Sequence, residues 1–165
     1  MLARLLGLAG PLLWCVLVLL AHLRATTGSS AADCSFDNGD LCGWTNTGAK
    51  PWEPLQGSTR STGTGPAGDH TSGSGTYMYV EASRNAGLGP FTLWAALGGG
   101  DGDGGLGLGD ASFFYSMYGA AVGSLSLETS TDNATWTEQW AREGDQVSRA
   151  QRASTITMDH GPRFL

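Results

Sequence analysis

The chain has 165 residues, 26 of them glycine, and a formal net charge of −6 with only 15% charged residues. This length suits one domain with a core of its own. An acidic chain lacks the basic stripe that binds phosphate backbones, so the composition excludes nucleic acid as a partner.

The first 32 residues have the pattern of a secretory signal peptide. Arg4 supplies a positive charge, residues 5–20 are almost entirely apolar, and residues 29–32 are small. This pattern predicts cleavage after Ala32 and a secreted protein or one on the extracellular face of a membrane. The alternative is an uncleaved signal anchor, because the 19 residues 5–23 approach the ~20 that span a bilayer. A membrane contact is expected only through such an anchor or through a missing downstream segment.

Cleavage would leave residues 33–165 as one β domain, with seven basic and fifteen acidic residues. Cys15 would be lost, so Cys34 and Cys42, with seven residues between them, would be the only cysteines. In an oxidising compartment these two are expected to form a disulfide, with free or metal-bound thiols as the alternative. The segment 37–40 between them, Asp-Asn-Gly-Asp, is typical of a turn.

The remaining chain predicts short strands separated by turns, and no window has a sustained helical period. Two prolines argue against a central strand within 44–55, and the Gly-, Ser- and Thr-rich segment 56–75 is predicted to be mostly loop. The fold class expected is therefore all-β, an antiparallel sandwich. The strand candidates are residues 76–81, 91–97, 112–118, 123–129, 135–141 and 154–158.

Alternation along these strands predicts which side chains share a face. Tyr77 and Tyr79 should lie on one face of their strand, opposite Met78 and Val80. Leu125 and Leu127 should face the core. Trp136 and Trp140 are four residues apart, so they are expected on one face, as core rather than as a carbohydrate platform.

Several short pieces in a fixed order carry a family resemblance. They are Cys34-x-Phe36-Asp, Cys42-Gly-Trp44, Trp52, Gly65-Pro66, Asp69-His70-Thr71, Gly75-x-Tyr77, Phe113-x-Tyr115-x-Met117-Tyr118-Gly119 and Gly144-Asp-Gln146. Together they resemble a MAM domain, the extracellular module named for meprins, neuropilins and receptor tyrosine phosphatases, from about residue 33 to 159. The resemblance implies a jelly-roll-like β-sandwich, a structural role for these motif residues, and a role in adhesion, homophilic contact or assembly without catalysis.

The chain also departs from the family pattern. The family usually has a cysteine just ahead of the Phe-x-Tyr segment, where this chain reads Gly109-Asp-Ala-Ser112, and its partner would lie beyond Leu165. The sequence also stops before the closing strand of such domains. The resemblance therefore implies either an incomplete chain or a last sheet edge that is left unpaired, and an unpaired edge favours association.

Some of the aspartates could in principle belong to a catalytic site or to a metal site. Asp69 and His70 invite a search for a catalytic triad, but neighbours on a strand point in different directions and no nucleophile elbow is present, so no catalytic residue is assigned. By resemblance a structural calcium ion could lie near Asp37 and Asp69, with turn-capping aspartates as the alternative. Asp101-Gly-Asp-Gly-Gly105 imitates an EF-hand loop but lacks its tight-turn glycine and closing glutamate, which indicates a plain loop.

Asn133-Ala-Thr135 is an N-glycosylation sequon in a predicted turn of a secreted chain, so we expect a glycan on Asn133. The function expected is extracellular protein–protein recognition, with an external protein or a second copy as partner. The alternatives are an accessory domain of a larger enzyme, such as a secreted protease, and a carbohydrate-binding sandwich.

Overall fold

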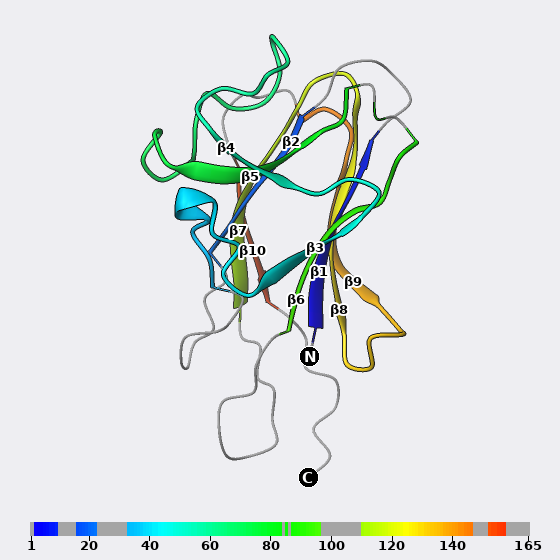
Figure 1. Ribbon diagram of the computed structural model, residues 1–165. Coiled ribbons are helices and arrows are strands. Elements are labelled where there is room, and N and C mark those ends of the chain that lie inside the picture. Colours follow the sequence, from blue (N-terminus) through cyan, green and yellow to red (C-terminus); the bar gives the residue numbers. More distant parts are fainter. Residues whose placement is uncertain are drawn as a thin grey trace.

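The computed structural model describes residues 2–9, 16–22, 33–83, 85, 87–96, 110–146 and 152–157. These residues form strands and one short 3₁₀ helix, η1 (Asp37–Gly39), so the expected all-β class is confirmed (Figure 1). The strands are β1 (Leu2–Ala9), β2 (Val16–His22), β3 (Trp44–Gly48), β4 (Glu53–Gln56), β5 (Thr76–Glu81), β6 (Phe91–Ala96), β7 (Asp110–Tyr118), β8 (Val122–Ser130), β9 (Thr137–Glu143) and β10 (Arg152–Thr157).

Two antiparallel five-stranded sheets face each other. Sheet A has the order β3-β6-β1-β8-β9, and sheet B has the order β10-β7-β2-β5-β4. From β5 to β8 the chain changes sheet at every strand, as in a jelly roll. The segment with two prolines supplies β3 and β4, which are edge strands of the two sheets, as Pro54 requires.

The core lies between the sheets and follows the predicted alternation. Leu125 and Leu127 of β8 are buried, and so are Met78 and Val80 of β5. Phe36, which precedes η1, is 0% exposed although its φ is +60°. An aromatic residue in left-handed backbone is unusual, so burial of the ring offsets a local conformational cost.

A second, smaller apolar cluster lies on the outer face of sheet B. Tyr77 and Tyr79 are 0% and 1% exposed there, with Leu55 and Phe114 packed against them. The loop 57–75 covers this face, and its Gly57 carbonyl accepts a 2.7 Å hydrogen bond from the Tyr77 hydroxyl. Burial, together with the neighbouring Tyr79, raises the pKa of Tyr77 to about 12. The predicted opposition of the two tyrosines to Met78 and Val80 is therefore confirmed.

The N-terminal segment is where the structure differs most from what the sequence predicts, because residues 1–32 were expected to lie outside the fold. β1 is the middle strand of sheet A and β2 is the middle strand of sheet B. An apolar run rich in leucine and valine can pair as a strand as readily as it can serve as a leader. The edges of the two sheets are β3, β9, β10 and β4. Cleavage after Ala32 stays a prediction.

The expectation that Trp136 shares the core face of Trp140 was wrong. Trp140 is 9% exposed in the core, whereas Trp136 precedes β9, is half-buried and stacks with Arg4. The β8–β9 register jumps from Leu127↔Trp140 to Glu128↔Glu138. This bulge adds one residue to β9 and reverses the alternation beyond it. The EF-hand-like segment 101–105 lies outside the described residues.

Candidate recognition surface

Cys34 and Cys42 form the predicted disulfide, which closes the loop around η1. The sulfur atoms are 2.08 Å apart and the Cα atoms 5.8 Å apart. Asn38 and Gly39 have φ values of +57° and +75°, as turn residues of these types allow. Cys34 is 2% exposed and belongs to the core, so the bridge anchors an otherwise exposed turn to the sandwich.

The turn of η1 and the loop 57–75 meet at Gly75, which brings Asp37 and Asp69 together. A Cβ atom added to Gly75 would lie 3.0 Å from Asp37 Oδ1 and 3.2 Å from Asp69 Oδ2. A side chain at this position would therefore crowd both carboxylates, which would have to shift by a few tenths of an ångström. The structure thus places the two predicted metal ligands side by side, although they are 32 residues apart in the sequence.

Asp69 already accepts several hydrogen bonds. Its Oδ2 accepts from the backbone N–H groups of Thr71 and Ser72, and its Oδ1 accepts from the Ser72 hydroxyl and the Gly75 N–H. Partial burial raises the pKa of Asp69, but these bonds together outweigh it and hold the pKa below its usual value. A carboxylate has about four acceptor sites, so a metal ion at Asp69 would compete with the loop's own donors.

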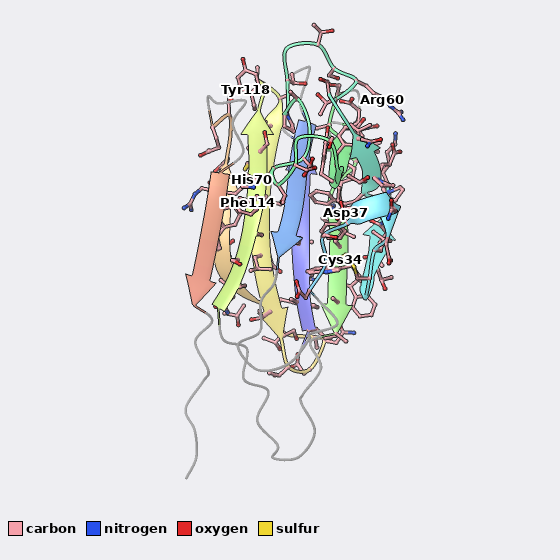
Figure 2. All side chains as sticks on the ribbon, turned by 90° about the vertical axis from the view of Figure 1, so that its left-hand side faces the viewer. Cys34, Asp37, Arg60, His70, Phe114 and Tyr118 are labelled. Atoms are coloured by element: carbon pink, nitrogen blue, oxygen red, sulfur yellow. A yellow bond between two sulfur atoms is a disulfide. The ribbon has the colours of Figure 1, made fainter. Side chains whose placement is uncertain are left out.

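His70 faces away from Asp69. Its ring stacks on Phe114 of β7 with 3.4 Å between ring centroids and 12° between planes, on the outer face of sheet B (Figure 2). The Asp69 carboxylate instead turns to Ser72 and Gly75. The two side chains therefore do not form the hydrogen-bonded pair that orients a catalytic base.

Three motif pieces that are far apart in sequence meet at the end of β7. The Gly65 N–H donates to the carbonyl of Tyr118 at 3.1 Å, and the Gln146 N–H donates to the carbonyl of Met117 at 2.7 Å. The Gly119 N–H donates to Asp145 Oδ1 at 3.2 Å. These bonds join two loops to the end of β7. Among the other motif residues, Trp44 and Tyr115 are core residues, Pro66 is buried, and the Thr71 N–H donates to Asp69.

Sheet A presents a continuous row of outward side chains. Cross-strand pairing places Thr45, Trp94, Arg4, Glu128 and Glu138 side by side across all five strands. Paired residues point to the same side of a sheet. Thr45 and Glu138 are exposed, and the other three are half-buried. We call this row, together with Trp136, the sheet A face.

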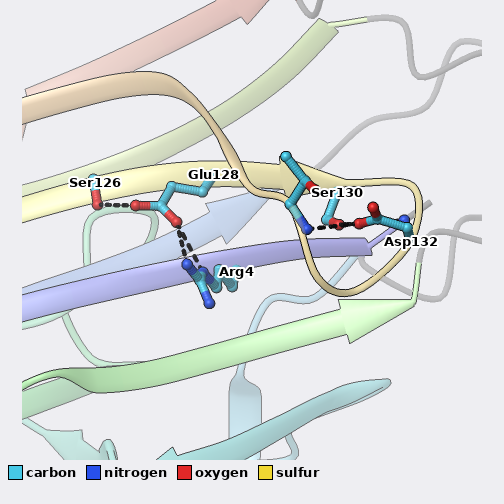
Figure 3. Close-up of polar contacts among 6 residues, drawn as sticks. Arg4, Ser126, Glu128, Ser130 and Asp132 are labelled. Carbon is cyan, nitrogen blue, oxygen red and sulfur yellow. Dashed lines mark hydrogen bonds and ion pairs between the residues drawn. The ribbon is translucent and has the colours of Figure 1, made fainter.

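Arg4 holds the centre of the sheet A face. Its Nη2 lies 2.7 Å from Glu128 Oε2, and its Nε donates to the same oxygen at 2.8 Å (Figure 3). Its guanidinium carbon also lies 3.9 Å from the centre of the Trp136 ring, a cation–π geometry. Sequence reasoning assigned Arg4 only to a leader and did not single out Trp94. The available signal was the place of Trp94 in the strand candidate 91–97, where it lies on the face opposite Phe91 and Leu93.

The sequon lies in the exposed turn between β8 and β9. Asn133 is exposed and has a φ of +57°. Asp132 Oδ1 accepts the N–H groups of Thr135 and Ala134 at 2.7 and 2.8 Å, which holds the pKa of Asp132 well below its usual range. Glycosylation itself stays a prediction.

Comparison with known proteins places these motifs in a family. A model of the MAM domain, meprin/A5/mu, matches residues 34–162. The chain belongs to the MAM domain family. Mouse MAM domain-containing protein 2 is 37% identical over 118 residues, which cover 69% of this chain and 16% of that protein. Thyroid hormone-induced protein B of Xenopus laevis is 38% identical over 124 residues, covering 68% and 16%. Human MAM domain-containing protein 2 is 33% identical over 145 residues, covering 80% and 20%.

The chain thus spans about a fifth or less of the length of these relatives. No solved structure shows a significant match. MAM domains are extracellular modules, which agrees with the disulfide. Among the described residues, no helix is both long and apolar enough to cross a membrane.

Proposed function

We propose that this MAM domain is a non-catalytic extracellular recognition module that binds a protein through the sheet A face. The observation that carries the proposal is the composition of that face. Trp94 and Trp136 are half-buried on the solvent side of a regular sheet, next to the charged Glu128. Partly exposed aromatic side chains are enriched in protein interfaces, and they often contribute most of the binding energy.

The opposite face supports the same choice. On sheet B the loop 57–75 already covers Tyr77 and Tyr79, so its aromatic surface is used within the domain. Cross-strand partners continue across all five strands of sheet A, which suits contact with another sheet. A second copy of the chain is the partner to test first, since a homophilic contact needs no further component.

Sedimentation velocity of the full chain, refolded with its disulfide, over a range of concentrations tests this proposal. We expect reversible self-association that is weakened at least tenfold by Trp94→Glu and is insensitive to added sugars. The matched control is Leu88→Glu, because Leu88 is an exposed apolar residue, 43% exposed, outside both sheets. Equal association of the wild type and Trp94→Glu would overturn the sheet A assignment. Binding to a glycan array without self-association would favour the carbohydrate alternative.

We also propose, from the family resemblance and the meeting of Asp37 and Asp69 at Gly75, that calcium stabilises this corner. The described residues contain no group of three His, Cys, Asp or Glu side chains suited to a metal. Backbone oxygens and water would therefore have to complete the six to eight oxygen ligands of calcium. Asp69 would contribute only by giving up a loop hydrogen bond.

Thermal melting with 2 mM calcium and with EDTA tests this ion. We expect calcium to raise the melting temperature and Asp37→Ala to abolish the increase. The control is Asp132→Ala, which removes an aspartate that also caps its own turn but lies far from Gly75 in the sequence. A wild-type melting curve that calcium leaves unchanged would exclude the ion and leave the two aspartates as turn caps.

A further inference from the structure

A recess of about 160 Å³ lies beside the pairing of β4 with β5 in sheet B. We call it the β4–β5 recess, and its polar lining residues are Lys50, Glu53, Arg60, Tyr79, Glu81 and Asn85. All of them lie in the segment that the MAM domain model matches, and the strands that line the recess do not belong to sheet A. Sites for larger ligands start at roughly 300 Å³, so this recess suits a group of the size of one side chain.

Hydrogen bonds within the domain hold the two loops that border the β4–β5 recess. The Asn46 side-chain amide donates to the carbonyl of Trp52 at 3.1 Å and accepts the Trp52 N–H at 2.8 Å, which fixes the loop between β3 and β4. Ser61, next to Arg60, is buried, and its hydroxyl bonds to both carboxylate oxygens of Glu81 at 3.2 and 3.0 Å. The backbone around the recess is therefore already in place, which lowers the entropic cost of binding.

The carboxylate of Glu81 is satisfied by donors of the domain itself. Besides the Ser61 hydroxyl, its Oε1 accepts the Ser83 N–H at 3.0 Å and its Oε2 accepts the Tyr79 hydroxyl at 3.4 Å. Burial and the neighbouring Glu81 raise the pKa of Tyr79 to about 12, so this hydroxyl stays a neutral donor. A carboxylate has about four acceptor sites. Glu81 is therefore part of the wall of the recess and offers no position to a ligand's donor.

Lys50 and Arg60, by contrast, keep their donors for a ligand. Arg60 Nη2 lies 4.0 Å from Glu53 Oε2, and the two side chains are 73% and 51% exposed. An exposed ion pair of this kind contributes little to stability. In the part of the chain that the structure describes, neither Lys50 nor Arg60 donates a hydrogen bond. A guanidinium carries five N–H donors and an ammonium group three, so the capacity for hydrogen bonding that remains in the recess is mainly that of cations.

We propose that the β4–β5 recess binds a carboxylate group of about the size of a glutamate side chain. Arg60 holds this group through two parallel hydrogen bonds, the arrangement in which a guanidinium matches a carboxylate, and Lys50 adds a second positive charge. Glu53 weakens the binding, because it offers a competing carboxylate to the same guanidinium. The group can belong to an acidic side chain of a protein or to a free dicarboxylic acid. The recess is separate from the sheet A face, so either proposal can fail without the other.

An NMR titration of the full chain, refolded with its disulfide and labelled with nitrogen-15, tests the ligand. The probes are glutarate and three short glycine peptides, capped at both ends, whose central residue is glutamate, glutamine or lysine. We expect the glutamate peptide to shift the amide signals of residues 60 and 79–81 to saturation, and the glutamine and lysine peptides to leave them in place. Tighter binding of the peptide than of glutarate would identify a protein as the source of the carboxylate, and the reverse would identify a free acid. Saturation by the lysine peptide, or by neither carboxylate probe, would overturn the proposal.

Two substitutions with opposite expected effects test the residues. Arg60→Gln should weaken binding of the carboxylate probe that saturates the recess by roughly tenfold, because hydrogen bonds to a charged group are lost. Glu53→Gln should strengthen it about threefold, because the competing carboxylate is removed. The control is Arg142→Gln, which removes an exposed guanidinium on β9 of sheet A and should leave the affinity unchanged. All three side chains are exposed, so the melting temperature should stay the same. Weaker binding by Glu53→Gln, or equal effects of Arg60→Gln and Arg142→Gln, would contradict the assignment.

Discussion

Asp69 shows how one side chain can organise a loop. The loop 57–75 has few apolar residues, so hydrogen bonds rather than apolar packing hold it together. Asp69 accepts these bonds from Thr71, Ser72 and Gly75. Hydrogen bonds to the charged form of a carboxyl group lower its pKa and link the folded state to pH. The position of His70 over Phe114 follows, because the same loop crosses the outer face of sheet B.

The pKa of Asp69 is lowered in the folded protein, so its contribution to stability is complete above the unfolded value of about 3.9. That contribution is lost as the pH falls through the folded value. Asp69→Asn should therefore destabilise the protein at pH 7 and make its stability less dependent on pH below about 4. Urea denaturation between pH 2 and 7 measures both effects. The control is Glu138→Gln, which removes an exposed carboxylate on β9. If Glu138→Gln reduced the pH dependence of stability as much as Asp69→Asn does, the assignment to Asp69 would be contradicted.

At the scale of elements, the end of β3 depends on close approach between backbones. Gly48 has a φ of +108°, and a Cβ atom there would lie 2.5 Å from the carbonyl oxygen of Pro90, next to its partner Phe91 on β6. Edge strand β3 can therefore pair with β6 along its full length only if this position lacks a side chain. Gly57 also has a positive φ, +77°, but no atom lies within 4 Å of its added Cβ.

These two glycines give a matched pair of substitutions. Gly57→Ala should cost about 1 kcal/mol, the cost of left-handed backbone alone. Gly48→Ala should cost roughly 3 kcal/mol, because backbone clash adds to that cost. Denaturant unfolding of both variants measures the difference in free energy of unfolding. Equal losses would mean that β3 moves away from Pro90 without penalty.

The sandwich as a whole is joined by contacts between segments far apart in the sequence. The Cys34–Cys42 bridge attaches the first turn to the core. Met117, Tyr118 and Gly119 at the end of β7 gather the loops around residues 65 and 145. Loops held in this way leave the side chains of the sheet A face half-buried or exposed and the β8–β9 turn exposed, where recognition and glycosylation are expected.

The protein secreted from its native source should carry one glycan and one disulfide. Its intact mass should fall on enzymatic deglycosylation in the wild type but not in Asn133→Gln, because Asn133 is exposed in the turn. Reduction should raise the mass by two hydrogens, as expected for the single bridge between Cys34 and Cys42. Thr135→Ala, which breaks the sequon but keeps Asn133, is the control. Deglycosylation that leaves the wild-type mass unchanged would refute occupancy of this site.

Local pattern was enough to determine the all-β class, the disulfide turn, most strands to within a few residues and the inward faces of β5 and β8. Alternation and turn chemistry act between neighbours in sequence, so they can be recognised without the fold. The family motifs likewise predicted that Asp37 and Asp69 belong to one corner. They did not predict that Gly75 would separate the two carboxylates.

Tertiary structure alone decided which strands are neighbours. A period of two tells which face a side chain occupies but not which strand lies beside it, and a single bulge reverses the face, as at Trp136. The same limit applies to residues 2–22, whose apolar pattern suits both a leader and a strand pair. Only long-range strand pairing places this segment at the centre of both sheets, with Glu128 and Trp136 around Arg4 in sheet A.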